Sequence, residues 1–214
     1  IRSLYPDSET GLSEERVNES RDRNEAMLRA ASDTEVVQLG SDLKVRVVNY
    51  SGHKLPTGYP EGRRMWLNVQ FFNGDDSLID EYGEYDYADA ELDDSDTKVY
   101  EVQQVIDSNV AAATNLPVHA HFHIALATKI LLDNRIPPIG FVNADYEAAG
   151  AAPVGVTYDD GQHWDDTTFQ IPGGAAYAVV TLYYQPMTKE YIEFLRDANT
   201  TNSDGQTAYD VWED

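Results

Sequence analysis

Three of the five histidines stand at alternate positions in one short segment, at His119, His121 and His123. On a β-strand the three imidazoles would share one face, with neighbours about 6–7 Å apart. Two neutral imidazoles completed by a carboxylate or a third histidine suit zinc, copper or iron. The segment therefore predicts a copper or zinc site. The alternatives are histidines that bond to backbone or carboxylates, or one axial ligand to a haem held elsewhere.

A second candidate is the loop at residues 52–66, which packs a histidine, two prolines, three glycines and an arginine pair between two strand-like runs. Glycine and proline free or restrict the backbone, so this composition predicts a rigid loop that holds His53 in a fixed place. Arg63 and Arg64 could clamp haem propionates, or a carboxylate such as Glu61, through paired N–H donors. Internal salt bridges are the simpler role for two arginines in an acidic chain.

Paired aspartates recur along the chain and supply hard oxygen ligands of the kind that calcium takes from flexible loops. Asp159, Asp160 and Asp165 stand close together in one such stretch, and none of the clusters follows EF-hand spacing. The sequence therefore predicts a calcium site at these three residues, with solvated surface charge as the alternative.

The chain is strongly acidic. It carries 38 acidic and 15 basic residues, for a formal net charge of −23. Such a surface repels nucleic acid and anionic membranes, which excludes both as expected partners, and it favours cations, basic partners or a saline habitat. Solubility alone would also explain the charge. With 214 residues and 42% hydrophobic content, the chain can bury the core of one domain.

There is no cysteine in the chain. This excludes disulfides, Fe–S clusters, thiolate zinc sites, cysteine nucleophiles and covalent haem attachment through C-x-x-C-H within these residues. The sequence also lacks a nucleophile elbow, a P-loop and a dinucleotide fingerprint. No segment resembles a signal peptide, and no apolar run has the length of a membrane span. We therefore expect neither intrinsic catalysis nor membrane insertion.

The elements that must position these residues are mostly strands. A helical pattern covers residues 13–32, with a polar first half, and a short amphipathic helix covers residues 189–196. Alternating apolar residues predict strands at 36–39, 43–50, 65–72, 77–82, 99–105 and 175–184. Residues 83–98 and 139–170 have few regular signals, and the segment at 119–126 is ambiguous.

This order of elements predicts a mainly β fold, a β-sandwich with an N-terminal helical arm and a short C-terminal helix. We divide the chain into a polar segment and helical arm at 1–34, the sandwich at 35–186, and a C-terminal helix and tail at 187–214.

Four sequence blocks together carry a resemblance to a known family. They are GHKLPTGYPEGRR at 52–64, DNRIPP at 133–138, YDDGQHWD at 158–165, and YQ at 184–185 leading into EYIEFL at 190–195. In this content and order the chain resembles the haem-free C-terminal β-domain of bacterial multihaem c-type cytochromes, from about Arg23 to its C-terminus.

The resemblance implies an exported protein, periplasmic or extracellular, that works in electron transfer as part of a larger complex. In such relatives C-x-x-C-H motifs precede this domain, so haem c would be carried upstream of Ile1 or by a multihaem cytochrome subunit on which the chain docks. His53, or one of the three alternating histidines, could then be an axial ligand, with Arg63 and Arg64 in contact with haem. Two other functions remain open: a metal-binding protein or metalloenzyme that uses the histidine segment, and a calcium-dependent module that binds glycan or matrix.

Overall fold

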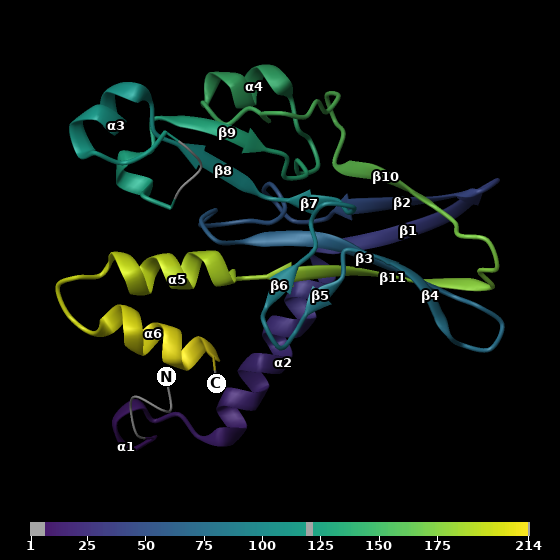
Figure 1. Ribbon diagram of the computed structural model, residues 1–214, viewed down its shortest axis with the longest axis horizontal. Coiled ribbons are helices and arrows are strands. Elements are labelled where there is room, and N and C mark those ends of the chain that lie inside the picture. Colours follow the sequence, from purple (N-terminus) through teal and green to yellow (C-terminus); the bar gives the residue numbers. More distant parts are fainter. Residues whose placement is uncertain (1–6, 119–121, 214) are drawn as a thin grey trace.

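The computed structural model describes residues 7–118 and 122–213 (Figure 1). Its helices are α1 (Asp7–Thr10), α2 (Glu14–Ala30), α3 (Ser108–Thr114), α4 (Asn143–Ala148), α5 (Lys189–Ala198) and α6 (Asp204–Glu213), with a 3-10 turn η1 (Ile124–Leu126). Its strands are β1 (Ser32–Leu39), β2 (Asp42–Asn49), β3 (Arg64–Phe72), β4 (Leu78–Tyr82), β5 (Tyr85–Asp86), β6 (Glu91–Leu92), β7 (Val99–Tyr100), β8 (Val102–Val105), β9 (Lys129–Asp133), β10 (Trp164–Gln170) and β11 (Tyr177–Gln185).

Two antiparallel sheets form the centre of the molecule (Figure 1). One sheet has the strand order β1–β2–β10, and the other has the order β11–β3–β4, with β7 also paired to β3. The remaining strands form two short ribbons, β5–β6 and β8–β9. The fold is therefore mainly β, which confirms the predicted sandwich with helices at its N-terminal and C-terminal ends.

The core lies between the two sheets and explains why the period-two segments fold as strands. Alternate side chains of β2 and of β3 point into it, because successive side chains of a strand face opposite ways. The buried cluster consists of Leu43, Val45, Val47, Leu55, Met65, Leu67, Val69, Phe71, Tyr100, Ile136 and Phe169. Two of its members, Leu55 and Ile136, come from the sequence blocks rather than from the sheets, so those blocks are part of the folded core.

The outer face of β3 is covered as well. Trp66 is only 3% exposed there, and its ring lies 5.1 Å from that of Tyr183 and 5.3 Å from that of Tyr85. Tyr85 belongs to the β5–β6 hairpin, which folds from the acidic segment that the sequence analysis left without regular structure. Aromatic packing on one buried tryptophan thus gives this acidic stretch a fixed position.

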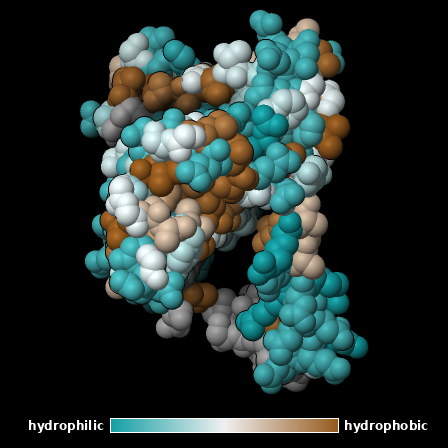
Figure 2. Space-filling view, turned by 90° about the vertical axis from the view of Figure 1, so that its right-hand side faces the viewer, coloured by the Kyte–Doolittle hydropathy of each residue, from teal (hydrophilic) through white to brown (hydrophobic). Residues whose placement is uncertain are grey.

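The predicted N-terminal arm is α2, a helix without a buried residue. Ser13 caps it, because its hydroxyl accepts a hydrogen bond from the backbone N–H of Arg16 at 3.3 Å. Figure 2 shows the arm as a hydrophilic projection beside the body of the molecule. None of the described helices is long and apolar enough to cross a membrane.

Several elements differ from the sequence-based prediction, among them the short helices α3 and α4 and the strand β9, which were not predicted. Residues 164–170 form β10, an edge strand that contributes Phe169 to the core, within a segment that had few regular signals. The C-terminal tail folds into a second helix, α6, which packs against α5. The ambiguous segment at 119–126 ends in the 3-10 turn η1, with His123 immediately before it. His119 and His121 lie outside the described residues.

Candidate functional site

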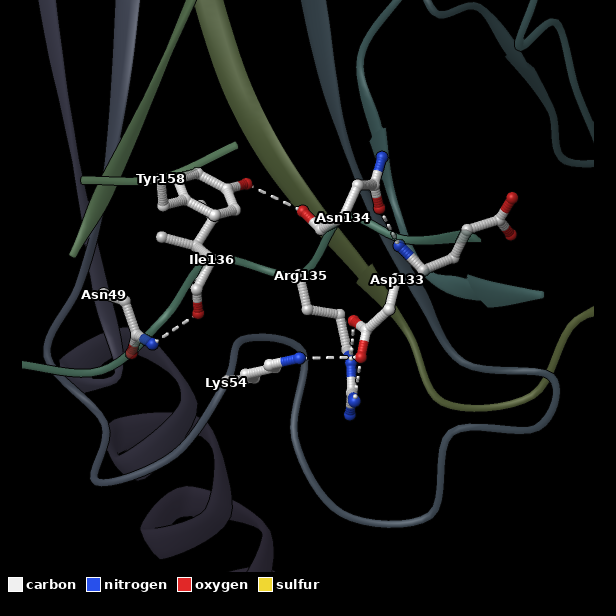
Figure 3. A network of polar contacts seen from close by, with 8 residues as sticks. Asn49, Lys54, Asp133, Asn134, Arg135, Ile136 and Tyr158 are labelled. Atoms are coloured by element: carbon white, nitrogen blue, oxygen red, sulfur yellow. Dashed lines mark hydrogen bonds and ion pairs between the residues drawn. The ribbon is translucent and has the colours of Figure 1, made fainter. Parts of the chain in front are cut away.

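The glycine- and proline-rich loop is fastened to the DNRIPP block by backbone hydrogen bonds. Leu55 and Ile136 exchange N–H···O bonds of 2.9 Å in each direction. The Asn49 side chain reinforces this contact, because its amide donates to the carbonyl of His53 at 2.8 Å and to that of Ile136 at 2.9 Å (Figure 3). The loop is therefore rigid at its centre, as its composition predicted.

A buried ion cluster lies under the same loop (Figure 3). Asp133 accepts from Lys54 Nζ at 2.8 Å, and Arg135 binds both of its carboxylate oxygens at 2.9 Å. Burial would raise the pKa of Asp133, but the hydrogen bonds from Arg135 and Lys54 together hold this pKa below its usual value. Burial lowers the pKa of Lys54, and Asp133 only partly offsets the effect. The carboxylate is thus the centre of the cluster.

The third block joins the second through Tyr158, whose side chain is fully buried. Its hydroxyl donates to the carbonyl of Asn134 at 2.9 Å. The Asn134 amide in turn accepts from the backbone N–H of Glu101 at 2.8 Å and donates to the carbonyl of Val99 at 2.6 Å. The YDDGQHWD and DNRIPP blocks are thereby tied to β7 and β8.

The fourth block contacts the loop at its C-terminal end, at Gly62 and Arg64. The backbone N–H of Thr188 donates to the carbonyl of Gly62 at 2.9 Å, and Arg64 Nε donates to Gln185 Oε1 at 2.8 Å. Gly62 has a φ of +68°, and a Cβ there would overlap the ring of Tyr191. All four blocks therefore interlock, and the residues that carry the family resemblance hold one end of the sandwich together.

A cavity of about 220 Å³ lies where the loop, β8 and the start of α5 meet. Two of the charged residues in its wall, Glu61 and Arg64, are 4% and 7% exposed. Glu61 Oε1 accepts from Gln104 at 2.7 Å, whereas Glu61 Oε2 and Arg64 Nη2 have no partner among the described residues. Burial raises the pKa of Glu101 in the same wall. Neither Glu101 nor Gln104 was predicted as a site residue, because Glu101 lies between β7 and β8, Gln104 lies in β8, and neither belongs to one of the four blocks.

His53 has a fixed backbone and an exposed ring. Its carbonyl accepts from both Asn49 and Ser51 at 2.8 Å, and the next residue, Lys54, belongs to the buried ion cluster. The imidazole lies beside a second cavity of about 510 Å³, whose wall includes Arg135. Within the described ranges, no side chain or backbone group forms a hydrogen bond with this ring. His53 thus presents an unengaged imidazole from a rigid loop.

The two predicted arginines have internal roles. Arg63 Nη1 donates to the carbonyl of Thr57 at 3.0 Å and so braces the loop against itself. Arg64 is buried between Gln185 and the ring of Trp66, which lies 5.8 Å from its guanidinium carbon. Contact between either arginine and haem stays a prediction.

Most of the predicted histidine metal site lies outside the described residues, because His119 and His121 are not among them. His123 is not on a strand, and its ring packs edge-on against Phe194 of α5, with 4.7 Å between ring centroids. The strand alternation that would align three imidazoles does not extend to His123. Across residues 7–118 and 122–213, no three His, Asp or Glu side chains are grouped so that they could hold a metal. Copper or zinc at this segment stays a prediction.

The three aspartates of the predicted calcium site have separate environments. Asp160 accepts two hydrogen bonds from Asn143, at 2.8 and 3.0 Å, which lower its pKa. Asp165 is buried in the sandwich, where it accepts from the Tyr100 hydroxyl at 3.1 Å. Asp159 is exposed. Calcium at these residues stays a prediction, and no contact in the structure brings their carboxylates together.

No protein-family model matches the chain, and no curated protein matches it. One solved structure is similar, the crystal structure of a penta-haem cytochrome c552 from Thermochromatium tepidum, with 16% sequence identity and a TM-score of 0.49. The match covers 85% of this chain and 37% of that one. This chain thus corresponds to little more than a third of that cytochrome's length.

Proposed function

We propose that the chain is a haem-free structural and docking module of an exported multihaem cytochrome assembly, periplasmic or extracellular. The haems would be attached to a partner subunit or to a region upstream of Ile1. The observation that carries the proposal is the interlocking of the four blocks, because the residues that resemble the cytochrome β-domain form one continuous set of contacts. Scattered matches would have no reason to meet in space.

Among the histidines that the structure describes, His53 is the best suited to face a haem. An axial ligand must be held in a fixed position, with its imidazole free to reach the iron. The His53 carbonyl is held by two hydrogen bonds, and its ring is exposed. We therefore propose His53 as an axial or contact residue for a haem on the partner or upstream region.

The charge of the chain supports docking on a basic surface. A net charge of −23 would speed association with a positively charged partner and would make that association sensitive to salt. Because the chain has no cysteine, covalent haem attachment would fall to the other component.

The experiment compares His53→Ala with wild type in the natively assembled protein, by visible absorption and electron paramagnetic resonance. We expect one haem to lose its low-spin signature while the others keep theirs. The matched control is His163→Ala, because His163 is half-buried and its ring already lies 3.1 Å from the carbonyl of Gly161. Unchanged spectra in the His53 variant would exclude the axial role. An assembly that elutes without any haem would contradict the docking role itself.

A further inference from the structure

A cavity of about 490 Å³ lies between the β5–β6 hairpin and α6, and Gln185 of the fourth block also lines it. Four aromatic rings line it, those of Tyr85 and Tyr87 from the hairpin segment and those of Tyr209 and Trp212 from α6. Tyr87 is 74% exposed, which is high for a ring of that size in a folded domain. Aromatic rings from two elements far apart in sequence thus line one hollow.

Each ring is held in place by a neighbour. Trp212 donates its indole N–H to the carbonyl of Met187 at 3.3 Å, and the hydroxyl of Tyr85 accepts from the Gln185 amide at 2.9 Å. Tyr87 packs edge-on against Tyr85, with 5.0 Å between centroids and 81° between planes. The walls are therefore preorganised, which lowers the entropy cost of binding.

Tyr209 is held from two sides. Its ring lies 4.3 Å from the guanidinium carbon of Arg196, so a cation already occupies a position over this ring. Its hydroxyl donates to Glu213 Oε1 at 3.1 Å, and this bond raises the pKa of Tyr209. The ring thus stays a neutral phenol at physiological pH.

Negative charge dominates the polar part of the wall. Asp89 and Glu213 are the carboxylates that line it, and Lys189 is its cation. Lys189 is already paired with Glu91 at 2.9 Å, so its charge is compensated. Electron-rich ring faces together with carboxylates attract cations, and they attract best those cations that shed water easily.

We propose that this cavity binds a small organic cation with a quaternary or methylated ammonium group. Such a group is weakly hydrated, and the aromatic rings and the two carboxylates of the wall would stabilise its charge. The cavity wall does not include His53, and the proposal does not depend on docking to a cytochrome.

The test is calorimetric titration of the whole chain with choline and, in parallel, with 3,3-dimethylbutan-1-ol, a neutral molecule of nearly the same shape. We expect choline to bind at least about tenfold more tightly, because the charge supplies the cation–π attraction that the alcohol lacks. Equal affinities would overturn the proposal, since they would mean that the hollow is merely apolar. No heat with choline at millimolar concentration would overturn it as well.

Tyr87→Ala is the diagnostic variant, because a ring that is 74% exposed can be removed without opening the core. We expect choline affinity to fall about tenfold. The matched control is Tyr50→Ala, a 51% exposed tyrosine outside the cavity wall, which should bind as wild type does. Equal losses in both variants would contradict the site.

Two further titrations distinguish the source of the ligand. Phosphatidylcholine vesicles present the same ammonium beside a phosphate, which Asp89 and Glu213 would repel, so we expect free choline to compete fully and vesicles to bind more weakly. Binding to vesicles without binding to free choline would overturn the proposal. Binding of a neutral oligosaccharide in place of choline would overturn it too, because sugars stack on aromatic rings without needing a positive charge.

Discussion

Replacement of Asp133 by asparagine should destabilise the fold far more than loss of its lysine partner. Asp133 is 5% exposed and binds two cations, Lys54 and Arg135, whose side chains are 6% and 17% exposed. The Asp133→Asn variant keeps the shape of the side chain but removes the charge, which leaves two cations in the interior without a counter-ion.

Removal of one partner from a buried ion pair costs about 3–5 kcal/mol. Domains of this kind are stable by about 5–15 kcal/mol, so the loss is a large share of the total. The Lys54→Met variant differs, because Asp133 keeps both bonds from Arg135 and because burial disfavours the Lys54 ammonium, as its lowered pKa indicates. We expect Lys54→Met to cost no more than about 1–2 kcal/mol.

Urea unfolding followed by tryptophan fluorescence measures the difference, since Trp66 is buried in the native state. The midpoint of Asp133→Asn should fall by about 1–2 M relative to wild type. If this variant does not fold, the double variant Lys54→Met/Asp133→Asn should recover part of the loss, because it leaves a single unpaired cation. A free energy of unfolding for Asp133→Asn within about 1 kcal/mol of wild type would refute the reasoning.

Two other substitutions probe the sheet and the interlocked loop. The pKa of Asp166 is lowered to about 2, chiefly by a hydrogen bond from Arg46. The ionised Asp166 therefore stabilises the fold at pH values above its unfolded pKa of about 4, and this stabilisation is lost as the pH falls through the folded pKa of about 2. The stability difference between Asp166→Asn and wild type, measured by urea unfolding across this range, should therefore be largest above pH 4, shrink steadily as the pH falls and vanish only below pH 2. A difference independent of pH would contradict the assignment. Gly62→Ala should lower the melting temperature by several degrees, because the added methyl group meets Tyr191 and the φ is positive, whereas Gly74→Ala, with open space around it, should not. Equal melting temperatures for the two glycine variants would show that the loop is not closely packed on α5.

The sequence predicts those strands whose residues on one face are apolar. In β2 the run Leu43, Val45 and Val47 faces the core, and the alternating residues in between are partly exposed. Of the three inward positions of β10 only Phe169 is apolar, whereas Asp165 and Thr167 hold the other two, so no hydrophobic alternation marks this strand. Asp165 is accommodated there because Tyr100 donates to it from the opposite sheet, a contact that only the folded chain reveals.

The candidate site was predictable only in part, because the sequence shows the composition of its loop but not the long-range contacts that hold it. The glycines and prolines at 52–66 predict a rigid loop, and the structure shows the loop held by backbone hydrogen bonds between Leu55 and Ile136. Several of the partners that fix it come from distant segments, as with Lys54 and Asp133, whose separation is 79 positions. No local pattern encodes such pairings. The aromatic cavity was not predicted from the sequence, because α6, which forms part of its wall, was itself not predicted.

The most direct test of the account is the absorption spectrum of the assembly that contains this chain, purified from its natural source and analysed for metals. The account predicts a Soret band whose intensity keeps a constant ratio to the amount of this chain. The haem should be attached outside residues 1–214, because these residues contain no cysteine. A colourless preparation, or one with copper or zinc in place of haem iron, would contradict the proposal of a cytochrome module.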